Sequence, residues 1–248
     1  MTKRICLWSG PRNISTALMY SFAQRADTTV VDEPLYAHYL STTDAHTYHP
    51  GSAEVMAVQE NDGAKVVREV ILGDYPTRLV FFKHMTHHLV NLDWDFLDQT
   101  INVLLTRDPR DMLPSYAKNV KQPTLRDTDY ADHLKLLDYL RSRGQTPPVL
   151  EAKQVLLNPR GVLSRLCQQI GIPFDEAMLS WPAGPRPEDG VWAKHWYHSV
   201  HQSTGFEAYR PKASPFPEHL KPLLAECQPY YEQLAALAIQ ADQSQPEG

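Results

Sequence analysis

Near its start the chain reads Ile5-Cys-Leu-Trp-Ser-Gly-Pro-Arg-Asn-Ile-Ser-Thr-Ala-Leu-Met19, and this stretch decides the fold. A short apolar run ends at Gly10, a polar loop follows, and hydroxyl residues then open an amphipathic segment. This order predicts a β-strand, a loop and the N-terminus of a helix. The first backbone N–H groups of a helix lack intrahelical partners and lie at the positive end of the helix dipole, so they favour an oxyanion. Arg12 adds a full charge, and Ser15 and Thr16 add hydroxyl donors.

The loop does not match the Walker A motif of ATP-binding proteins, which requires GxxxxGK[ST]. Gly10 is followed by Pro-Arg-Asn-Ile-Ser-Thr16, so the second glycine and the lysine are both absent. An ordinary ATP site is therefore disfavoured.

A second segment, Ile101-Asn-Val-Leu-Leu-Thr-Arg-Asp-Pro-Arg-Asp-Met-Leu-Pro-Ser-Tyr116, repeats this design. An apolar strand is followed by Arg107, and Asp108 and Pro109 form a helix cap and a first helical position. Ser115 lies eight residues after Arg107. Because Asp108 and Pro109 belong to the turn into the helix, both side chains can face one anion, Arg107 from the strand end and Ser115 from the first two helical turns.

The two segments together resemble the nucleotide loops of sulfotransferases that use 3′-phosphoadenosine-5′-phosphosulfate (PAPS). In that family a basic residue precedes Ser-Gly-[Ser/Thr]-Thr after the first strand, and Asn13 and Ile14 depart from this pattern. A later segment, Leu150 to Phe174, resembles the "E…P…LC…LGIPF" segment of the family. The resemblance implies that the 5′-phosphosulfate is bound by Arg12, Asn13, Ile14, Ser15 and Thr16, and the 3′-phosphate by Arg107 and Ser115.

Strand and helix patterns alternate along the chain. We expect strands at 5–8, 28–31, 79–83, 102–106 and 149–152, and helices at 15–24, 109–119, 130–141, 159–170 and 220–238. This order predicts an α/β fold in three layers (α/β/α) around a central parallel sheet, with ligands at the carboxyl ends of the strands. With the resemblance, we expect the P-loop nucleotide-hydrolase-like sulfotransferase fold, one domain over residues 1–240 and a disordered tail at 241–248.

Composition narrows the class of protein. The 248 residues carry a net charge of −5, which argues against a broad surface for nucleic acid or anionic membranes. Neither a leader peptide nor an apolar run of membrane-spanning length is recognisable. The three cysteines, Cys6, Cys167 and Cys227, are far apart and read as reduced thiols, so we expect a cytoplasmic protein. We expect no metal, because no CxxC pair occurs and the histidines lack a third ligand nearby.

Sulfuryl transfer requires a base for the acceptor proton and positive charge at the leaving group. Glu33, in Val31-Asp-Glu-Pro-Leu-Tyr36, follows the second strand, where the resemblance to tyrosylprotein sulfotransferases implies the base. The competing base is a histidine of the segment Phe82-Lys-His-Met-Thr-His-His-Leu89, for which His84 is the candidate. Cytosolic sulfotransferases have Lys-Thr-His here; Lys83 matches, but Met85 occupies the histidine position.

The resemblance further implies that Arg12 stabilises the leaving phosphate. The segment Gly190-Val-Trp-Ala-Lys-His-Trp-Tyr197 stands where many sulfotransferases close a basic loop on the 3′-phosphate, which makes Lys194 a candidate for donor binding. The acceptor is expected to be a small molecule with a hydroxyl or an amine. Two alternatives stay open: a nucleotide-dependent small-molecule kinase, and a sulfotransferase-like protein that binds a nucleotide or a partner without turnover.

Overall fold

The structure is a computed structural model and describes residues 2–211 and 214–241. Five strands form one sheet: β1 (Lys3–Ser9), β2 (Thr28–Asp32), β3 (Leu79–Met85), β4 (Ile101–Thr106) and β5 (Val149–Glu151). The α-helices are α1 (Ser15–Ala23), α2 (Tyr36–Thr42), α3 (Ser52–Val58), α4 (Gly63–Val66), α5 (Pro109–Tyr116), α6 (Tyr130–Ser142), α7 (Ala152–Leu157), α8 (Pro159–Gln169), α9 (Ala193–Trp196), α10 (His198–His201) and α11 (Lys221–Ala235). The π-helical turn η2 (Val67–Ile71) and short 3₁₀ turns, among them η3 (Thr86–His88) and η5 (Leu125–Thr128), complete the chain.

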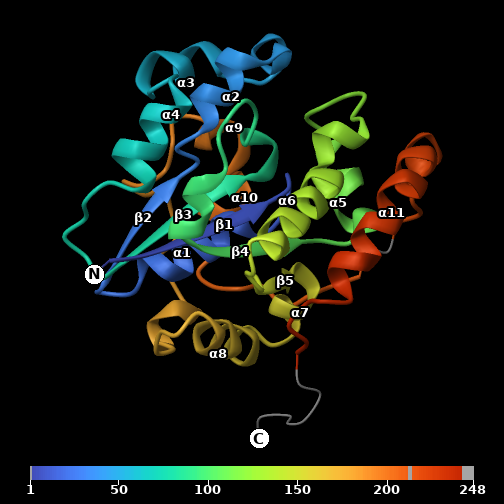
Figure 1. Cartoon of the computed structure of the whole chain (residues 1–248). Helices are drawn as coiled ribbons and strands as arrows, with labels where there is room; N and C mark the ends of the chain where they lie inside the picture. The colour runs from blue at the N-terminus through green and yellow to red at the C-terminus, as the bar shows by residue number, and fades with distance from the viewer. Residues whose placement is uncertain (1, 212–213, 242–248) are drawn as a thin grey trace, which may run out of the picture.

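All strand pairs are parallel, and the strand order is β2-β3-β1-β4-β5 (Figure 1). The central strand β1 ends at Ser9, opposite Met85 of β3 and Leu105 of β4. Because all five strands are parallel, their carboxyl ends lie along one edge of the sheet. This is the edge at which ligands bind in open α/β sheets.

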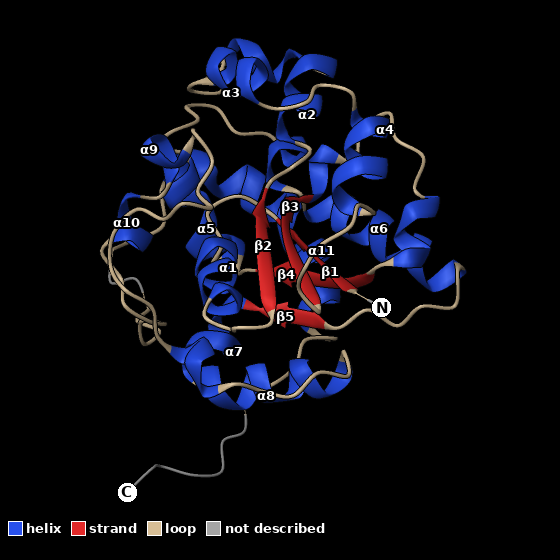
Figure 2. Ribbon diagram, turned by 90° about the vertical axis from the view of Figure 1, so that its left-hand side faces the viewer, coloured by secondary structure: helices blue, strands red, loops and turns tan. Residues whose placement is uncertain are grey.

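Helices cover both faces of the sheet (Figure 2), so the strands are apolar on both sides. Ile5 and Leu7 of β1 pack in one core cluster with residues of α1 and α8. Cys6 and Trp8, which alternate with them, pack in a second cluster with residues of α6 and α11. This period of two decides which strand side chains can reach each face.

The expected strands and helices are confirmed, with small shifts at their ends. The helix after Arg107 ends at Tyr116 instead of residue 119. The stretch after β2, which carried no sequence assignment, forms α2, α3, α4 and η2. Of the tail expected at 241–248, the structure describes Ala241, whose N–H donates to Gln154 Oε1 at 2.9 Å; residues 242–248 lie outside the described part.

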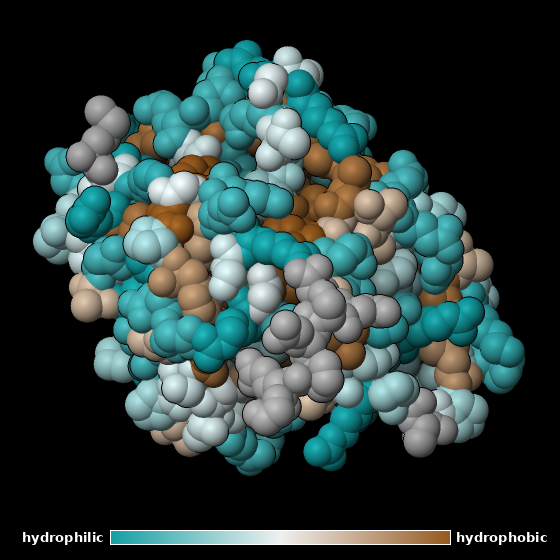
Figure 3. Space-filling model, turned by 90° about the horizontal axis from the view of Figure 1, so that it is seen from below, coloured by the Kyte–Doolittle hydropathy of each residue, from teal (hydrophilic) through white to brown (hydrophobic). Residues whose placement is uncertain are grey.

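None of the described helices combines the length and the apolar character that crossing a membrane requires. The face seen in Figure 3 is mostly hydrophilic, and hydrophobic residues interrupt it in separate patches. Within the described residues, His, Cys, Asp and Glu form no group of three or more that could hold a metal ion.

Candidate active site

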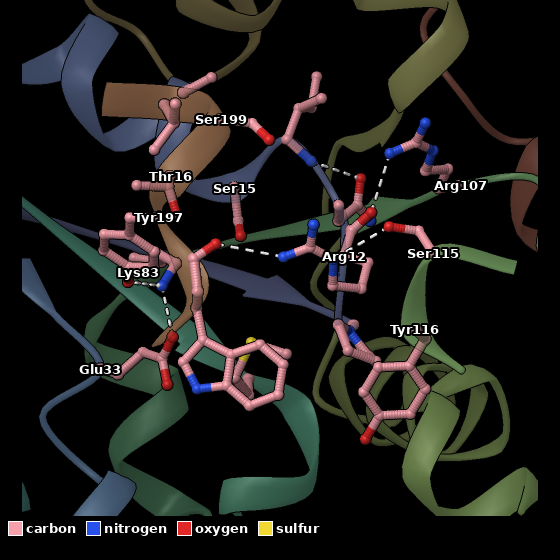
Figure 4. A pocket seen from close by; sticks show the side chains of 18 of the residues that line it. Arg12, Ser15, Thr16, Glu33, Lys83, Arg107, Ser115, Tyr116, Tyr197 and Ser199 are labelled. Carbon is pink, nitrogen blue, oxygen red and sulfur yellow. Dashed lines mark hydrogen bonds and ion pairs between the residues drawn. The ribbon is translucent and has the colours of Figure 1, made fainter. Parts of the chain in front are cut away.

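A cavity of about 430 Å³ opens at the carboxyl edge of the sheet. Its walls come from the loop between β1 and α1, from the ends of β2 and β3, from Arg107 after β4, from the end of α5, and from α9 and α10. Figure 4 shows Arg12, Arg107 and Ser115 in one part of this cavity, and Glu33 and Lys83 in another.

The loop after β1 has an unusual backbone at Arg12, whose φ is +52°. A positive φ is uncommon in residues other than glycine and is found at functional sites. Ile14, in contrast, has φ −91° and ψ 20°, which a branched residue adopts without the left-handed strain. Asn13 braces the loop: its side chain donates to the Leu105 carbonyl oxygen at 3.2 Å and accepts from the Ile14 N–H at 2.9 Å. The two departures from the family pattern are therefore compatible with an ordered loop.

The N-terminus of α1 is open to a ligand. No side chain caps it, and no acidic residue lies in its first turn. Ser15 and Thr16 line the cavity together with the loop. The free N–H groups and hydroxyls leave this end of the helix suited to an anion.

The structure brings the two predicted anion sites together. Arg12 Nε donates to Ser115 Oγ at 3.1 Å, and Arg107 Nη1 donates to the Arg12 carbonyl oxygen at 2.9 Å. Burial and the neighbouring Arg107 charge lower the pKa of Arg12. Among the described residues, neither arginine forms an ion pair with a carboxylate. Two partly buried guanidinium groups without an acidic partner are the arrangement expected of an anion site.

Glu33 lies in the other part of the cavity, in a cluster around Lys83. Lys83 Nζ donates to Glu33 Oε1, to Asp32 Oδ1 at 2.9 Å and to the Tyr197 hydroxyl at 2.6 Å. Burial raises the pKa of Glu33, and Asp32 adds to the rise, while Lys83 opposes it. Burial alone would lower the pKa of Lys83, but the carboxylates of Asp32 and Glu33 raise it to about 12. Glu33 also has a positive φ, of +40°.

His84 lies outside the cavity, which removes the geometric basis for its predicted catalytic role. It alternates with Lys83 on β3, so it faces the opposite side of the sheet. Its ring stacks on Trp8, with 4.2 Å between the ring centroids, and is fully buried. Burial, with a contribution from Lys83, lowers the pKa of His84 to about 3. It therefore stays neutral within the apolar core.

Lys194 also does not line the cavity. It forms an ion pair with Glu54, and more than half of its side chain is exposed. Its neighbours contribute instead: the Trp196 carbonyl oxygen accepts from Arg12 Nη1 at 3.2 Å, and the Tyr197 hydroxyl donates to Asp32 Oδ2 at 2.7 Å. The segment 192–197 therefore contacts the loop after β1 through the Trp196 carbonyl oxygen and the Lys83 cluster through the Tyr197 hydroxyl, and not through the predicted positive charge.

Two histidines that sequence reasoning left unassigned do line the cavity. His87 Nδ1 donates to Asp129 Oδ2 at 2.8 Å. His88 is fully buried, stacks on Tyr36 with 5.1 Å between ring centroids, and has no partner for either ring nitrogen within the described residues. The position of both histidines shortly after an expected strand indicated that they could lie at the carboxyl edge of the sheet. Asp129 carried no such signal, because it lies 42 residues away in the chain.

Comparison with known proteins agrees with this geometry. The profile of the family described as "Sulfotransferase domain" matches residues 3–238. The chain belongs to the sulfotransferase domain family. The match includes both arginine loops, the Lys83 cluster and the segment that covers them.

Two curated relatives of this sulfotransferase domain come from Arabidopsis thaliana. Branched-chain-amino-acid aminotransferase-like protein 1 is 40% identical over 225 residues, which are 90% of this chain and 40% of that protein. Branched-chain-amino-acid aminotransferase-like protein 2 is 37% identical over 225 residues, with the same coverage. The chain thus spans about two fifths of the length of these relatives.

Solved structures of sulfotransferase domains share the fold. The domain from the curacin biosynthetic pathway has a TM-score of 0.52 at 14% identity and covers 92% of this chain and 98% of its own. The domain from the Synechococcus PCC 7002 olefin synthase has a TM-score of 0.54 at 18% identity, with coverages of 91% and 95%. The sulfotransferase from Alicyclobacillus acidocaldarius has a TM-score of 0.52 at 14% identity and covers 96% of both chains. The parallel sheet flanked by helices is therefore the P-loop-like sulfotransferase fold.

Proposed function

We propose that this domain transfers a sulfuryl group from PAPS to a hydroxyl or an amine of a small acceptor. The observation that carries the proposal is the pair Arg12 and Arg107, which lie side by side at the open N-terminus of α1 without a carboxylate partner among the described residues. An ATP-dependent kinase is disfavoured because the loop lacks the Walker lysine.

The donor would be held at two places. Ser15, Thr16 and the free N–H groups of α1 would hold the 5′-phosphosulfate, and Arg107 with Ser115 would hold the 3′-phosphate. When bound, PAPS supplies a sulfuryl group whose bond to the phosphate oxygen breaks, with its electron pair, as the bond to the acceptor oxygen or nitrogen forms. Arg12 lies between the two places and would stabilise the negative charge that develops on the leaving phosphate.

Glu33 would remove the acceptor proton. Its Oε1 accepts from Lys83, which orients the carboxylate, and no hydrogen bond to its Oε2 is formed by the residues described. A base whose second oxygen is free and whose pKa is raised accepts a proton more readily than an exposed carboxylate.

The cavity has aromatic walls, which suit an acceptor with apolar surface. Its aromatic lining residues include Tyr36, Tyr116, Trp192 and Trp196. Cys6, Cys167 and Cys227 are free and buried, which supports a reducing, cytoplasmic location.

Thermal unfolding tests the assignment without knowledge of the acceptor. 3′-Phosphoadenosine-5′-phosphate (PAP), the product nucleotide, should stabilise the domain by about 2.7 kcal/mol when present at 100 times its Kd. ATP with Mg²⁺ should stabilise it much less. Preferential stabilisation by ATP with Mg²⁺ would favour a kinase. PAP binding without turnover on any of a panel of alcohols, phenols and amines would favour a binding protein.

A further inference from the structure

The pair His87–Asp129 is a second set of ionisable side chains at the cavity, and its member His87 lines the cavity wall. Both oxygens of the Asp129 carboxylate lie within 2.9 Å of His87 Nδ1, and the His87 backbone N–H donates to Oδ1 at 2.7 Å. These bonds require the proton of the ring on Nδ1. Nε2 has no hydrogen-bond partner within the described residues, and His87 lines the cavity.

Asp129 is held firmly in a strained conformation. Its φ is +66°, its side chain is fully buried, and its carbonyl oxygen accepts from His133 Nδ1 at 2.8 Å. The pair also adjoins the loop after β1, since a Cβ on Gly10 would lie 3.0 Å from the Thr128 carbonyl oxygen and 3.4 Å from Asp129 Cβ. Asp129 therefore places His87 next to the beginning of the donor loop.

The electrostatics of the pair favour a protonated ring. A fully buried carboxylate needs a cation, and His87 is the group with which Asp129 forms an ion pair in the described part of the chain. Burial lowers the pKa of His87, but Asp129 outweighs this effect, so the pKa is raised.

Among the residues other than Asp129, those that change the pKa of His87 most are carboxylates that favour this state. Glu33, which follows β2, favours the imidazolium, as does Asp132 of α6. Burial lowers the pKa of His88 far below its usual value and that of His49 to about 4, so both stay neutral. Tyr39 of α2, whose ring centroid lies 4.6 Å from that of His87, has a raised pKa and stays protonated.

We propose that His87, held as an imidazolium by Asp129, is a second catalytic residue that donates a hydrogen bond from Nε2 to the sulfuryl oxygens, opposite the base Glu33. This role rests on the proposed function. Glu33 and His87 each stabilise the charged form of the other, which is the arrangement expected of a base and a cation that act on one reacting group. Asp129 is the positioning residue.

Nucleotide binding tests the role without an acceptor, because PAP lacks the sulfuryl group that PAPS carries. His87→Gln should weaken PAPS binding by roughly 10-fold or more and leave PAP binding within about twofold, since one charge-assisted hydrogen bond is lost. The exposed His219 gives the control, and His219→Gln should change neither affinity. Equal losses for PAPS and PAP would overturn the proposal, whereas failure of both nucleotides to bind the wild-type chain would overturn the proposed function itself.

The pH dependence separates a cation from a base. PAPS affinity of the wild type should fall as the pH rises through the His87 pKa, and PAP affinity should not. Asp129→Asn removes the stabilising charge, so this fall should move to lower pH. In turnover, the basic limb of the pH profile should move in the same direction. Movement of the acidic limb instead would identify His87 as a base and overturn the proposal.

Direct titration covers the case in which Asp129→Asn does not fold. In a chain with labelled histidines, the NMR signal that His87→Gln removes should titrate above the usual histidine pKa of about 6.5, and PAPS should raise its pKa further. A pKa below that value, or a pKa that PAPS leaves unchanged, would exclude an imidazolium that contacts the sulfuryl group.

Discussion

Arg107 donates a hydrogen bond from Nη1 to the backbone carbonyl oxygen of Arg12, at 2.9 Å. The bond joins the residue that follows β4 to the residue with positive φ in the loop after β1. Arg107 therefore has two effects: it places a charge at the edge of the sheet, and it holds the loop that carries Arg12.

Arg107→Ala should weaken PAP binding by about 2 to 4 kcal/mol, the scale of a lost charge-assisted contact in a partly buried site. Adenosine-5′-phosphosulfate lacks the 3′-phosphate and should lose less affinity. Its loss should equal only the part that comes from the loop that Arg107 holds. Isothermal titration calorimetry measures both. The exposed Arg110 of α5 provides the control, because Arg110→Ala keeps the loop and the cavity. Equal losses for the two nucleotides would contradict a role at the 3′-phosphate.

Arg12→Ala should lower kcat by more than it weakens PAP binding. The reason is that an interaction that strengthens in the transition state appears in kcat and not only in affinity. Arg12→Lys should retain part of the activity, because it keeps the charge and loses the bond from Nε to Ser115. Steady-state kinetics with PAPS and an active acceptor from the panel measure the effect. An unchanged kcat in Arg12→Ala would mean that the loop only binds the donor.

Glu33→Gln should lower turnover by about 10² to 10⁴ and leave PAP affinity near that of the wild type, because glutamine keeps the shape but accepts no proton. Since the Glu33 pKa is raised, the acidic limb of the kcat/KM profile should lie above about 4.3, the value of an exposed glutamate. Activity falls as the pH drops through this limb. The exposed Glu60 is the control, and Glu60→Gln should keep the wild-type profile. Wild-type turnover in Glu33→Gln would exclude this base.

Lys83→Met should lower the free energy of unfolding by about 3 to 5 kcal/mol, because it leaves the buried carboxylates of Asp32 and Glu33 without their cation. Denaturant titration measures the loss. In the wild type, the raised Lys83 pKa means that its contribution is complete below the unfolded pKa of about 10.4 and is lost as the pH rises toward about 12. The double variant Lys83→Met/Asp32→Asn should recover part of the stability. A loss of unfolding free energy below about 1 kcal/mol would show that water solvates the two carboxylates in place of the lysine.

The meeting of the two arginine loops was predictable from sequence because it depends on local order. Arg12 and Arg107 each follow an apolar strand directly, and parallel strands bring their carboxyl ends to one edge. The sequence also allows the prediction that Lys83 and His84 face opposite sides of the sheet, since side chains alternate along a strand. The prediction for His84 neglected that period.

The contacts around His87 were not predictable in the same way. Asp129 reaches His87 because α6 packs beside η3, and the sequence offers only a distant aspartate. The bond between Arg12 and the Trp196 carbonyl oxygen joins residues 184 positions apart. Its acceptor is a backbone atom, which every residue has, so the residue type at position 196 does not predict the bond.

The two tethers on Arg12 have a consequence for the thermodynamics of nucleotide binding. A free arginine side chain carries about 2 kcal/mol of rotamer entropy. Here Nε is engaged by Ser115 and Nη1 by the Trp196 carbonyl oxygen in the unliganded chain, so most of that entropy is lost on folding. The guanidinium group is therefore preorganised, and an arriving anion meets a positive charge that it does not have to immobilise.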